Sequence, residues 1–231
     1  MDEFKRKLIA AGFRGEIKDD DETREFYSHD ASLFEIKPQL VVFPKDSKDV
    51  QKLVRLVSEN KEKMPELSLT ARSAGTDMSG GAINESIIVD FNKHLTKIKS
   101  ITATEAHAEP GVFYRDFDAA TRKKGVFMPA YPASRDLCTI GGMVANNSGG
   151  EKSLQYGKVT EFVNELKVVF ADGNEYTVRP LDRTGLVKKI AQKDYEGKLY
   201  KRLFDLLEKH YDKIKAAKPQ VSKNSMGYNL W

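Results

Sequence analysis

Apolar and polar positions in the first part of the chain switch between helical and strand spacing. Apolar residues at helical spacing predict a short helix over residues 2–11, which Gly12 ends. The polar stretch 14–25 is predicted to be a loop. The short β-branched run 39–43 has the length and composition of a buried strand.

A helix and two more strands are predicted next. Asp46 or Ser47 is suited to cap a helix with apolar residues on one face. The apolar runs 67–71 and 86–91 are predicted strands. This strand–helix–strand order favours parallel pairing through a right-handed crossover.

The second half of the chain mixes strands and helices. Residues 101–109 are predicted to form a strand. Pro110 and Gly111 open a predicted helix that Gly125 closes, and 126–128 is a further predicted strand. These elements indicate a second structural region that starts near residue 100.

The last third carries a predicted hairpin and a long helix. Residues 164–170 alternate apolar and polar side chains, and Asp172-Gly173 is typical of a hairpin turn. A helix is predicted over 199–215, with a core face made of Leu203, Leu207, Tyr211 and Ile214. We therefore expect an α+β fold with an N-terminal helix and lead-in (1–37), a first lobe with a small parallel sheet (38–100), and a second lobe with a mainly antiparallel sheet flanked by helices (101–231).

Composition narrows the class of protein and its surroundings. The 231 residues are 40% hydrophobic and 31% charged, which is typical of a globular chain. The 38 basic and 34 acidic residues leave a net charge of +4 without a basic stripe, so no nucleic-acid partner is expected. Cys138 is the single cysteine, and no apolar run is long enough to span a bilayer. We expect a cytoplasmic protein, and peripheral membrane association stays compatible with this composition.

One glycine-rich segment follows a predicted strand at residues 70–81. It contains three glycines and four hydroxyl side chains. Small residues let a backbone approach a ligand closely, and successive free N–H groups attract an anion. Arg72 adds further donors, so the segment suits a pyrophosphate. Composition alone leaves an ordinary surface loop as an equal alternative.

A second glycine-rich segment covers 129–134 and 139–150. Thr139 is placed to cap a short helix whose first turn holds Gly141 and Gly142, a geometry that suits a phosphate or a flat ring. Asn146, Asn147 and Ser148 offer amide and hydroxyl groups for a heteroaromatic edge. A tightly packed turn is the alternative that composition leaves open.

Common nucleotide and metal motifs are absent from the sequence. No G-x-G-x-x-G follows a strand and no G-x-x-x-x-G-K-[ST] occurs, which disfavours a Rossmann site and excludes a P-loop. The four histidines, His29, His94, His107 and His210, are scattered and are expected to be structural. No metal site is predicted.

Taken together, the segments Arg72–Gly81 and Thr139–Gly149 resemble the paired FAD loops of the FAD-linked oxidases, the vanillyl-alcohol-oxidase or PCMH-type superfamily. The similarity is strongest to the D-lactate dehydrogenase and glycolate-oxidase-subunit branch. It extends from about Tyr27 to Trp231, and the supporting segments are Tyr27–Ser32, Glu109–Val112, Ser153–Gly157 and Phe170–Gly173. The resemblance implies two α/β lobes that hold FAD between them.

The resemblance also implies which residues contact FAD. Those expected along the pyrophosphate are Arg72, Ser73, Ala74, Gly75, Thr76, Asp77, Met78 and Ser79; those along the rest of the cofactor are Pro110, Gly111, Pro132, Ala133, Ser134, Thr139, Gly141 and Gly142, with Ala145, Asn146 and Ser148 towards the flavin. Many relatives have serine where this chain has Asp77, so we expect that carboxylate to face solvent or to accept a neighbouring backbone N–H. No histidine lies between residues 70 and 82, so non-covalent FAD is expected.

In the intact family enzyme, a 2-hydroxy acid of the D-lactate or glycolate type would lose a proton to a base and a hydride to flavin N5, giving the 2-oxo acid. The family's Gly-Tyr-Asn-Leu segment, found here at 227–230, precedes the rest of the flavin lobe and a substrate domain. The catalytic base is therefore expected beyond Trp231, and this chain alone is expected to be inactive. The alternatives are a non-catalytic FAD-binding module or subunit, and a flavin reductase that uses a nicotinamide. The sequence does not indicate the electron acceptor.

Overall fold

The computed structural model describes residues 1–221, 224, 228 and 230. Gly227, which opens the family-like segment near the end of the sequence, lies outside the described residues, as does Asn229. The chain divides into two compact units, Met1–Val178 and Arg179–Trp231. Among the described residues, no helix combines the length and the apolar character that crossing a bilayer requires.

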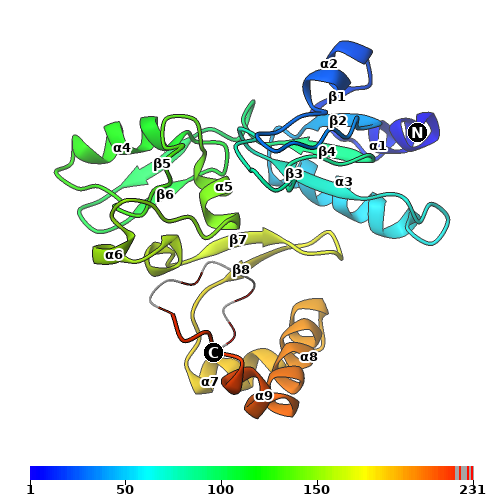
Figure 1. Ribbon diagram of the computed structural model, residues 1–231. Coiled ribbons are helices and arrows are strands. Elements are labelled where there is room, and N and C mark those ends of the chain that lie inside the picture. The colour runs from blue at the N-terminus through cyan, green and yellow to red at the C-terminus, as the bar shows by residue number, and fades with distance from the viewer. Residues whose placement is uncertain (222–223, 225–227, 229, 231) are drawn as a thin grey trace. The chain divides into compact units, whose positions relative to one another are not determined.

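The first unit opens with a four-stranded sheet in the order β1-β2-β4-β3 (Figure 1). Its strands are β1 (Glu16–Lys18), β2 (Leu40–Phe43), β3 (Leu69–Arg72) and β4 (Ile87–Asp90). Strands β2, β4 and β3 pair in parallel, as predicted, while β1 adds an antiparallel edge to β2. The parallel strands therefore end together on one edge of the sheet.

The prediction of a loop over 14–25 is wrong, because this stretch contains β1 and α2 (Asp21–Phe26). The Asp20 carboxylate accepts a hydrogen bond of 2.9 Å from the Thr23 backbone N–H and caps α2. Strand β1 is polar in sequence and forms through pairing with β2. Local composition gave no sign of that pairing.

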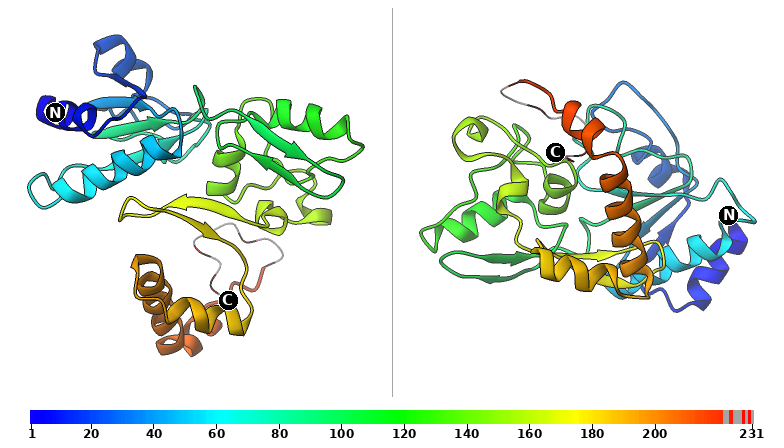
Figure 2. Two further views of the ribbon diagram at one scale, coloured as in Figure 1. Left: turned by 180° about the vertical axis from the view of Figure 1, so that it is seen from behind. Right: turned by 90° about the horizontal axis from the view of Figure 1, so that it is seen from below.

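Helices α1 (Asp2–Ala10) and α3 (Ser47–Asn60) bury one face of this sheet (Figures 1 and 2). Alternate residues of β2 and β4 point to this core, which contains Phe4, Leu8, Leu40, Val42, Leu53, Leu56, Leu67, Ile87 and Val89. The other residues of β2 and β4 point to the opposite face, where Tyr27 packs on Val41, Phe43 and Ile88. Because both faces are covered, β2 and β4 read as continuous apolar runs.

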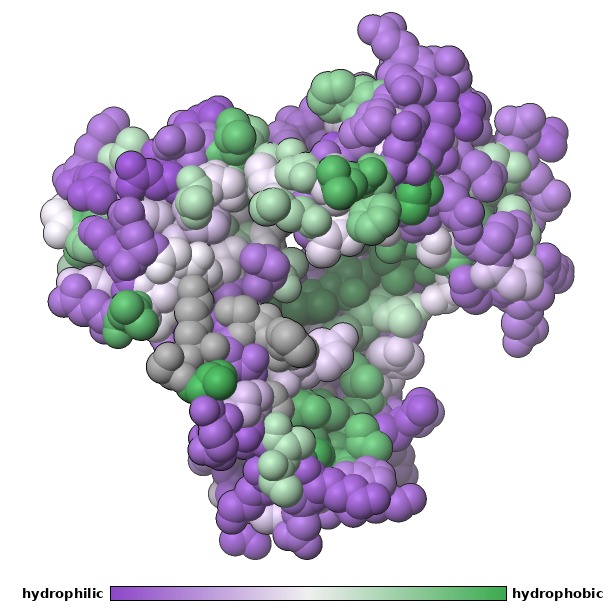
Figure 3. Space-filling model, viewed as in Figure 1, coloured by the Kyte–Doolittle hydropathy of each residue, from purple (hydrophilic) through white to green (hydrophobic). Residues whose placement is uncertain are grey.

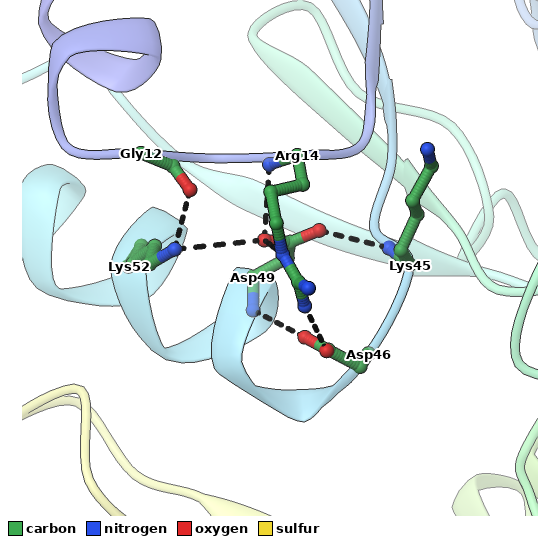
Figure 4. A network of polar contacts seen from close by, with 6 residues as sticks. All are labelled: Gly12, Arg14, Lys45, Asp46, Asp49 and Lys52. Atoms are coloured by element: carbon green, nitrogen blue, oxygen red, sulfur yellow. Dashed lines mark hydrogen bonds and ion pairs between the residues drawn. The ribbon is translucent and has the colours of Figure 1, made fainter.

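A polar network joins the start of α3 to the turn after α1 (Figure 4). Asp46 caps α3 by accepting the backbone N–H of Asp49 at 3.1 Å. Asp49 is fully buried, and its carboxylate accepts the backbone N–H groups of Arg14 and Lys45, each at 3.1 Å. The Arg14 guanidinium pairs with Asp46, which fixes the approach of the chain to the sheet.

The rest of the first unit has a second core beneath short helices. Its elements are β5 (Ile98–Ile101), β6 (Ala106–Ala108), α4 (Tyr114–Arg122), α5 (Ile140–Ala145), α6 (Ser153–Tyr156), the 3-10 helix η1 (Val159–Phe162), β7 (Leu166–Val169) and β8 (Glu175–Val178). The core contains Val112, Tyr114, Phe117, Ala130, Tyr131, Cys138, Met143 and Val159. Both two-stranded sheets, β5-β6 and β7-β8, are antiparallel. The α+β class with an antiparallel second lobe is thus confirmed.

Two strand predictions in this region are wrong. Residues 101–109 are not one strand but part of a hairpin, because the Thr102 hydroxyl accepts the N–H of Glu105 and closes a turn between β5 and β6. Residues 126–128 form no strand, since the Val126 N–H bonds back to the Thr121 carbonyl at 3.3 Å after Gly125 adopts φ +76°. This bond returns the chain to the end of α4.

The β7–β8 turn packs against α3 of the first sheet. The predicted Asp172-Gly173 hairpin is confirmed, with Gly173 at φ +74°. Arg55 of α3 donates to the Asn174 side-chain oxygen at 3.0 Å and to the Gly173 carbonyl at 3.3 Å. A Cβ at Gly173 would lie 2.6 Å from Arg55 Cβ, so glycine allows the close approach.

The second unit contains three helices, α7 (Arg183–Ile190), α8 (Tyr195–Lys209) and α9 (Tyr211–Ala216). The prediction of one helix over 199–215 is therefore wrong. The helix is interrupted at His210, where neither glycine nor proline marks the end. The predicted core face is also wrong in part, because Leu203 and Tyr211 are 47% and 57% exposed. Figure 3 shows apolar side chains gathered on the surface of these helices. The buried Glu196 carboxylate, paired with Lys189 at 2.7 Å, joins α8 to α7.

Candidate cofactor site

The first glycine-rich loop leaves the carboxyl end of β3, where parallel sheets commonly bind ligands. Gly75 and Gly80 adopt φ +68° and +83°. Within the described part of the chain, no acceptor takes the backbone N–H groups of Ala74–Met78. Such a row of free N–H groups on a tight turn is an anion-binding arrangement.

Asp77 is held by its own loop. Its Oδ1 accepts both the backbone N–H and the hydroxyl of Ser79, each at 2.7 Å. The expectation that this carboxylate bonds a neighbouring backbone N–H is confirmed. The loop thus satisfies its acid internally and keeps the N–H groups that precede it free.

Arg72 is buried at the start of this loop. One guanidinium nitrogen, Nη1, donates to the carbonyls of Tyr27 and Ala82, both at 3.3 Å, and the group lies 5.0 Å from the centre of the Tyr27 ring. Burial lowers the pKa of the guanidinium, which still leaves it charged at neutral pH. The two hydrogen bonds of Nη1 thus hold the guanidinium against backbone carbonyls of the protein.

The two glycine-rich loops meet at Ser73 and Thr139. Their hydroxyl oxygens lie 2.6 Å apart. Thr139 occupies the N-cap position of α5, as predicted, but its side chain makes no capping bond and reaches Ser73 instead. A Cβ at Gly142 would lie 2.9 Å from Ser73 Oγ. Glycine at 142 thus allows the close approach of the other loop.

The segment at Pro110 and Gly111 joins this meeting point. Gly141 donates its N–H to the Pro110 carbonyl at 2.8 Å, and a Cβ at Gly141 would lie 2.6 Å from Pro110 Cβ. A Cβ at Gly111 would lie 2.0 Å from the Phe91 carbonyl oxygen. The structure therefore brings together three of the predicted segments, all with little side-chain bulk.

The remaining predicted residues lie further along the second loop. Asn146 donates to the hydroxyl of the buried Ser148 at 3.2 Å, and Ala145 is exposed at the end of α5. A Cβ at Gly150 would lie 2.2 Å from the Tyr131 carbonyl, which places the chain after Ser148 against the turn that contains Pro132, Ala133 and Ser134.

A cavity of about 340 Å³ adjoins the first loop at the carboxyl ends of the parallel strands. Sequence reasoning selected Arg72, Ser73 and Ala74 from its lining but missed Phe26, Tyr27, Phe43, Asp90, Asn92, Lys93 and Phe113. The Tyr27 hydroxyl donates to Asp90 at 2.8 Å, and burial raises the pKa of the Asp90 carboxyl. The position of Phe43 and Asp90 at the ends of β2 and β4 was a signal that could have found part of this lining.

One group of side chains has the chemistry of metal ligands. Ligand atoms of Glu25, His29 and Glu35 lie within 4.8 Å of one another, and all three residues are exposed. Lys37 already pairs with Glu25 at 2.9 Å. We assign no metal to this group, and the expected absence of a metal site stays a prediction.

The joined loops suit a dinucleotide with a pyrophosphate. Free N–H groups and hydroxyls supply donors, the one acidic side chain in the first loop bonds within it, and glycines leave room where a Cβ would collide. The fold and this loop pair define a two-lobed cofactor-binding domain. Residues 38–179, more than half of the chain, match the family described as FAD binding domain, and the chain belongs to that family. FAD is the cofactor of this family.

Two curated relatives carry names of hydroxy-acid enzymes. The D-2-hydroxyglutarate dehydrogenase of Pseudomonas putida is 29% identical over 99% of this chain and 23% of its own length. The glycolate oxidase subunit GlcD of Bacillus subtilis is 32% identical over 87% of this chain and 41% of its own length. This chain therefore spans less than half of each of these two relatives.

Solved structures support the fold alone. An alkyldihydroxyacetonephosphate synthase matches with a TM-score of 0.65 at 23% identity, over 78% of this chain and 34% of that one. A chitooligosaccharide oxidase matches with a TM-score of 0.66 at 13% identity, over 80% of this chain and 38% of that one. The predicted PCMH-type fold is thereby confirmed.

Proposed function

We propose that this chain is the FAD-holding part of an enzyme that oxidises a 2-hydroxy acid to the 2-oxo acid. The observation that carries the proposal is the row of free N–H groups at Ala74–Met78, joined through Ser73 to the second glycine-rich loop. The names of the relatives, D-2-hydroxyglutarate dehydrogenase and glycolate oxidase subunit, support the reaction class.

The proposed contacts follow the order of the loops. Residues Ser73–Ser79 bind the pyrophosphate, mainly through backbone N–H groups. The small residues Pro110, Gly111, Gly141 and Gly142 leave space along the cofactor, with Thr139 and the turn Pro132–Ser134 beside them. Ala145, Asn146 and Ser148 lie towards the flavin. The cofactor is proposed to be non-covalent, because no histidine occurs between residues 70 and 82.

Bound FAD supplies a hydride acceptor, and the protein supplies binding and orientation. In this proposal the two loops fix the cofactor and keep water from its phosphates. The substrate carboxylate and the proton from its hydroxyl are handled by cations and a base outside this chain, as expected of a chain that spans 23% of the Pseudomonas relative.

The proposed substrate is a D-2-hydroxy acid, with D-2-hydroxyglutarate ahead of D-lactate and glycolate. Four relatives named D-2-hydroxyglutarate dehydrogenase match 94–99% of this chain. The relative named D-lactate dehydrogenase matches 58% of it. Because the relatives named D-2-hydroxyglutarate dehydrogenase match more of this chain than the one named D-lactate dehydrogenase, D-2-hydroxyglutarate is the favoured substrate.

FAD binding is tested by the visible spectrum of the purified chain and by the flavin released on denaturation. The expected result is a yellow protein with one FAD per chain, and a colourless folded protein that ignores added FAD contradicts the proposal. Gly142→Ala adds one methyl group near Ser73 Oγ, and the control Gly185→Ala adds one in helix α7, at a glycine without positive φ. Only the first should reduce flavin content.

The reaction is tested on the full-length protein without oxygen. D-2-hydroxyglutarate should bleach the flavin absorbance and its L-enantiomer should not. FAD binding without bleaching by D-2-hydroxyglutarate, D-lactate or glycolate supports the alternative of a non-catalytic FAD-binding module. Bleaching by NADPH alone supports a nicotinamide-dependent reductase.

A further inference from the structure

Arg72 is enclosed by the loop that it precedes. Its side chain is 7% exposed although the loop lies at the surface. A Cβ at Gly75 would lie 2.6 Å from Arg72 Nη2, so the loop wraps the guanidinium closely. Gly75 also has φ +68°, which a side-chain-bearing residue rarely adopts. The position of the guanidinium and the shape of the loop are therefore coupled.

The bonds of Arg72 connect the two ends of the loop. Arg72 stands at the end of β3, and Ala82, whose carbonyl it contacts at 3.3 Å, lies just after Gly81. The second bond, to the Tyr27 carbonyl at 3.3 Å, ties this closure to the chain after α2. The Ala31 N–H adds a third tether by donating to the Gly75 carbonyl at 3.0 Å.

Two acidic residues of the same lobe interact with the charge of Arg72. Asp30 and Asp90 both interact with it electrostatically and raise the pKa of the guanidinium, against the lowering by burial. Neither lies within ion-pair distance of it, and no other carboxylate among the described residues does. Both hydrogen bonds that the guanidinium makes go to backbone carbonyls, and they hold it beneath the loop.

We infer that Arg72 is a positioning residue, which holds the N–H groups of Ala74–Met78 in the shape that receives the pyrophosphate and does not contact the phosphates itself. This inference rests on the proposed function of the loop. It separates Arg72 from the other residues of its segment. Those act through backbone donors, whereas Arg72 acts on their geometry.

The test compares Arg72→Met and Arg72→Lys with the matched control Arg24→Met. Arg24 Nε donates to the Pro38 carbonyl at 2.7 Å, so the control removes a guanidinium–carbonyl bond away from the loop. Two quantities are measured for the whole chain. They are the Kd for FAD, and the hydrogen exchange of the Ala74–Met78 amides with FAD at saturation.

We expect Arg72→Met to weaken FAD binding by about tenfold or more, since the loss of charged hydrogen bonds displaces the loop. At saturating FAD, the Ala74–Met78 amides should exchange faster than in the wild type, while those near Gly142 stay protected. Arg72→Lys should lose nearly as much affinity, because an ammonium lacks the planar group that stacks on Tyr27. Arg24→Met should change neither quantity.

Three results overturn the inference while leaving FAD binding intact. One is wild-type affinity in Arg72→Met. Another is near-wild-type affinity in Arg72→Lys alone, which indicates a direct phosphate contact. The third is equal loss of protection at both loops, which indicates general destabilisation. If Arg72→Met does not fold, Arg72→Lys decides by the same criteria. Absence of FAD binding by the wild type instead contradicts the proposed function.

Discussion

Ser73 Oγ lies 2.6 Å from Thr139 Oγ1, so a hydrogen bond between side chains 66 positions apart joins the two glycine-rich loops. Either hydroxyl can be the donor. The bond holds the end of the parallel sheet against the first turn of α5. The two loops are therefore placed for a common function by the protein itself.

Removing either hydroxyl should loosen this junction. Ser73→Ala and Thr139→Val are each expected to lower the free energy of unfolding by about 1 kcal/mol. The double variant should cost less than the sum of the two, because both remove the same bond. Urea unfolding of the four proteins measures the coupling. The exposed Ser100→Ala serves as a control, and strict additivity speaks against the bond.

Gly142 is the glycine of the second loop at which an added side chain would meet Ser73 of the first loop. In Gly142→Ala, Ser73 has to turn away, which should resemble the loss of its hydroxyl. Gly142→Val adds two further methyl groups and should lower FAD occupancy far below that of the wild type. Flavin absorbance per folded chain is the measurement. Full flavin content in Gly142→Val counts against the placement of the loops on the cofactor.

Asp77 carries the only negative charge in the first loop, and replacing it should tighten FAD binding. Asp77→Asn keeps an oxygen to accept the Ser79 N–H while removing repulsion from the pyrophosphate. The Kd should fall by roughly two- to fivefold, and the difference should shrink at high salt. Titration of FAD at two ionic strengths measures this. The exposed Glu85→Gln is the control, and weaker binding in Asp77→Asn contradicts the expectation.

Cys138, next to Thr139, should be inert in the folded protein. Burial raises the pKa of its thiol to about 11, from 9.0 in the unfolded chain. The folded state therefore keeps its proton at pH values where the unfolded state loses it, and stability should decline as pH rises from 9 towards 11. Cys138→Ala should lack this part of the decline. A disulfide reagent should modify the wild type only after unfolding, and rapid labelling of the native protein contradicts this.

Sequence reasoning found the features that depend on local composition. The runs that became β2 and β4 are apolar because both of their faces are buried, and the two glycine-rich loops stand out by glycine and hydroxyl content. The Asp172-Gly173 turn was equally clear. These elements need little information from distant parts of the chain.

The remainder depends on contacts distant in sequence. Strand β1 exists through pairing with β2, and the lining of the cavity at Asp90 and Lys93 gathers strand ends that are far apart in the chain. The burial of Arg72 under its loop needs the carbonyls of Tyr27 and Ala82. Such features require the assembled fold and could not be read from the local sequence.

The hydrogen bonds from Arg55 to the β7–β8 turn have a consequence for the modularity of the first unit. The chain leaves the first sheet, builds the second lobe, and then returns to the helix that covers that sheet. The first sheet and its helices therefore use part of the second lobe as cover, since a protein cut near residue 100 would expose the surface of α3 that the returning turn contacts. Exchange of lobes between related proteins should therefore succeed only when the β7–β8 turn and helix α3 are taken from the same protein.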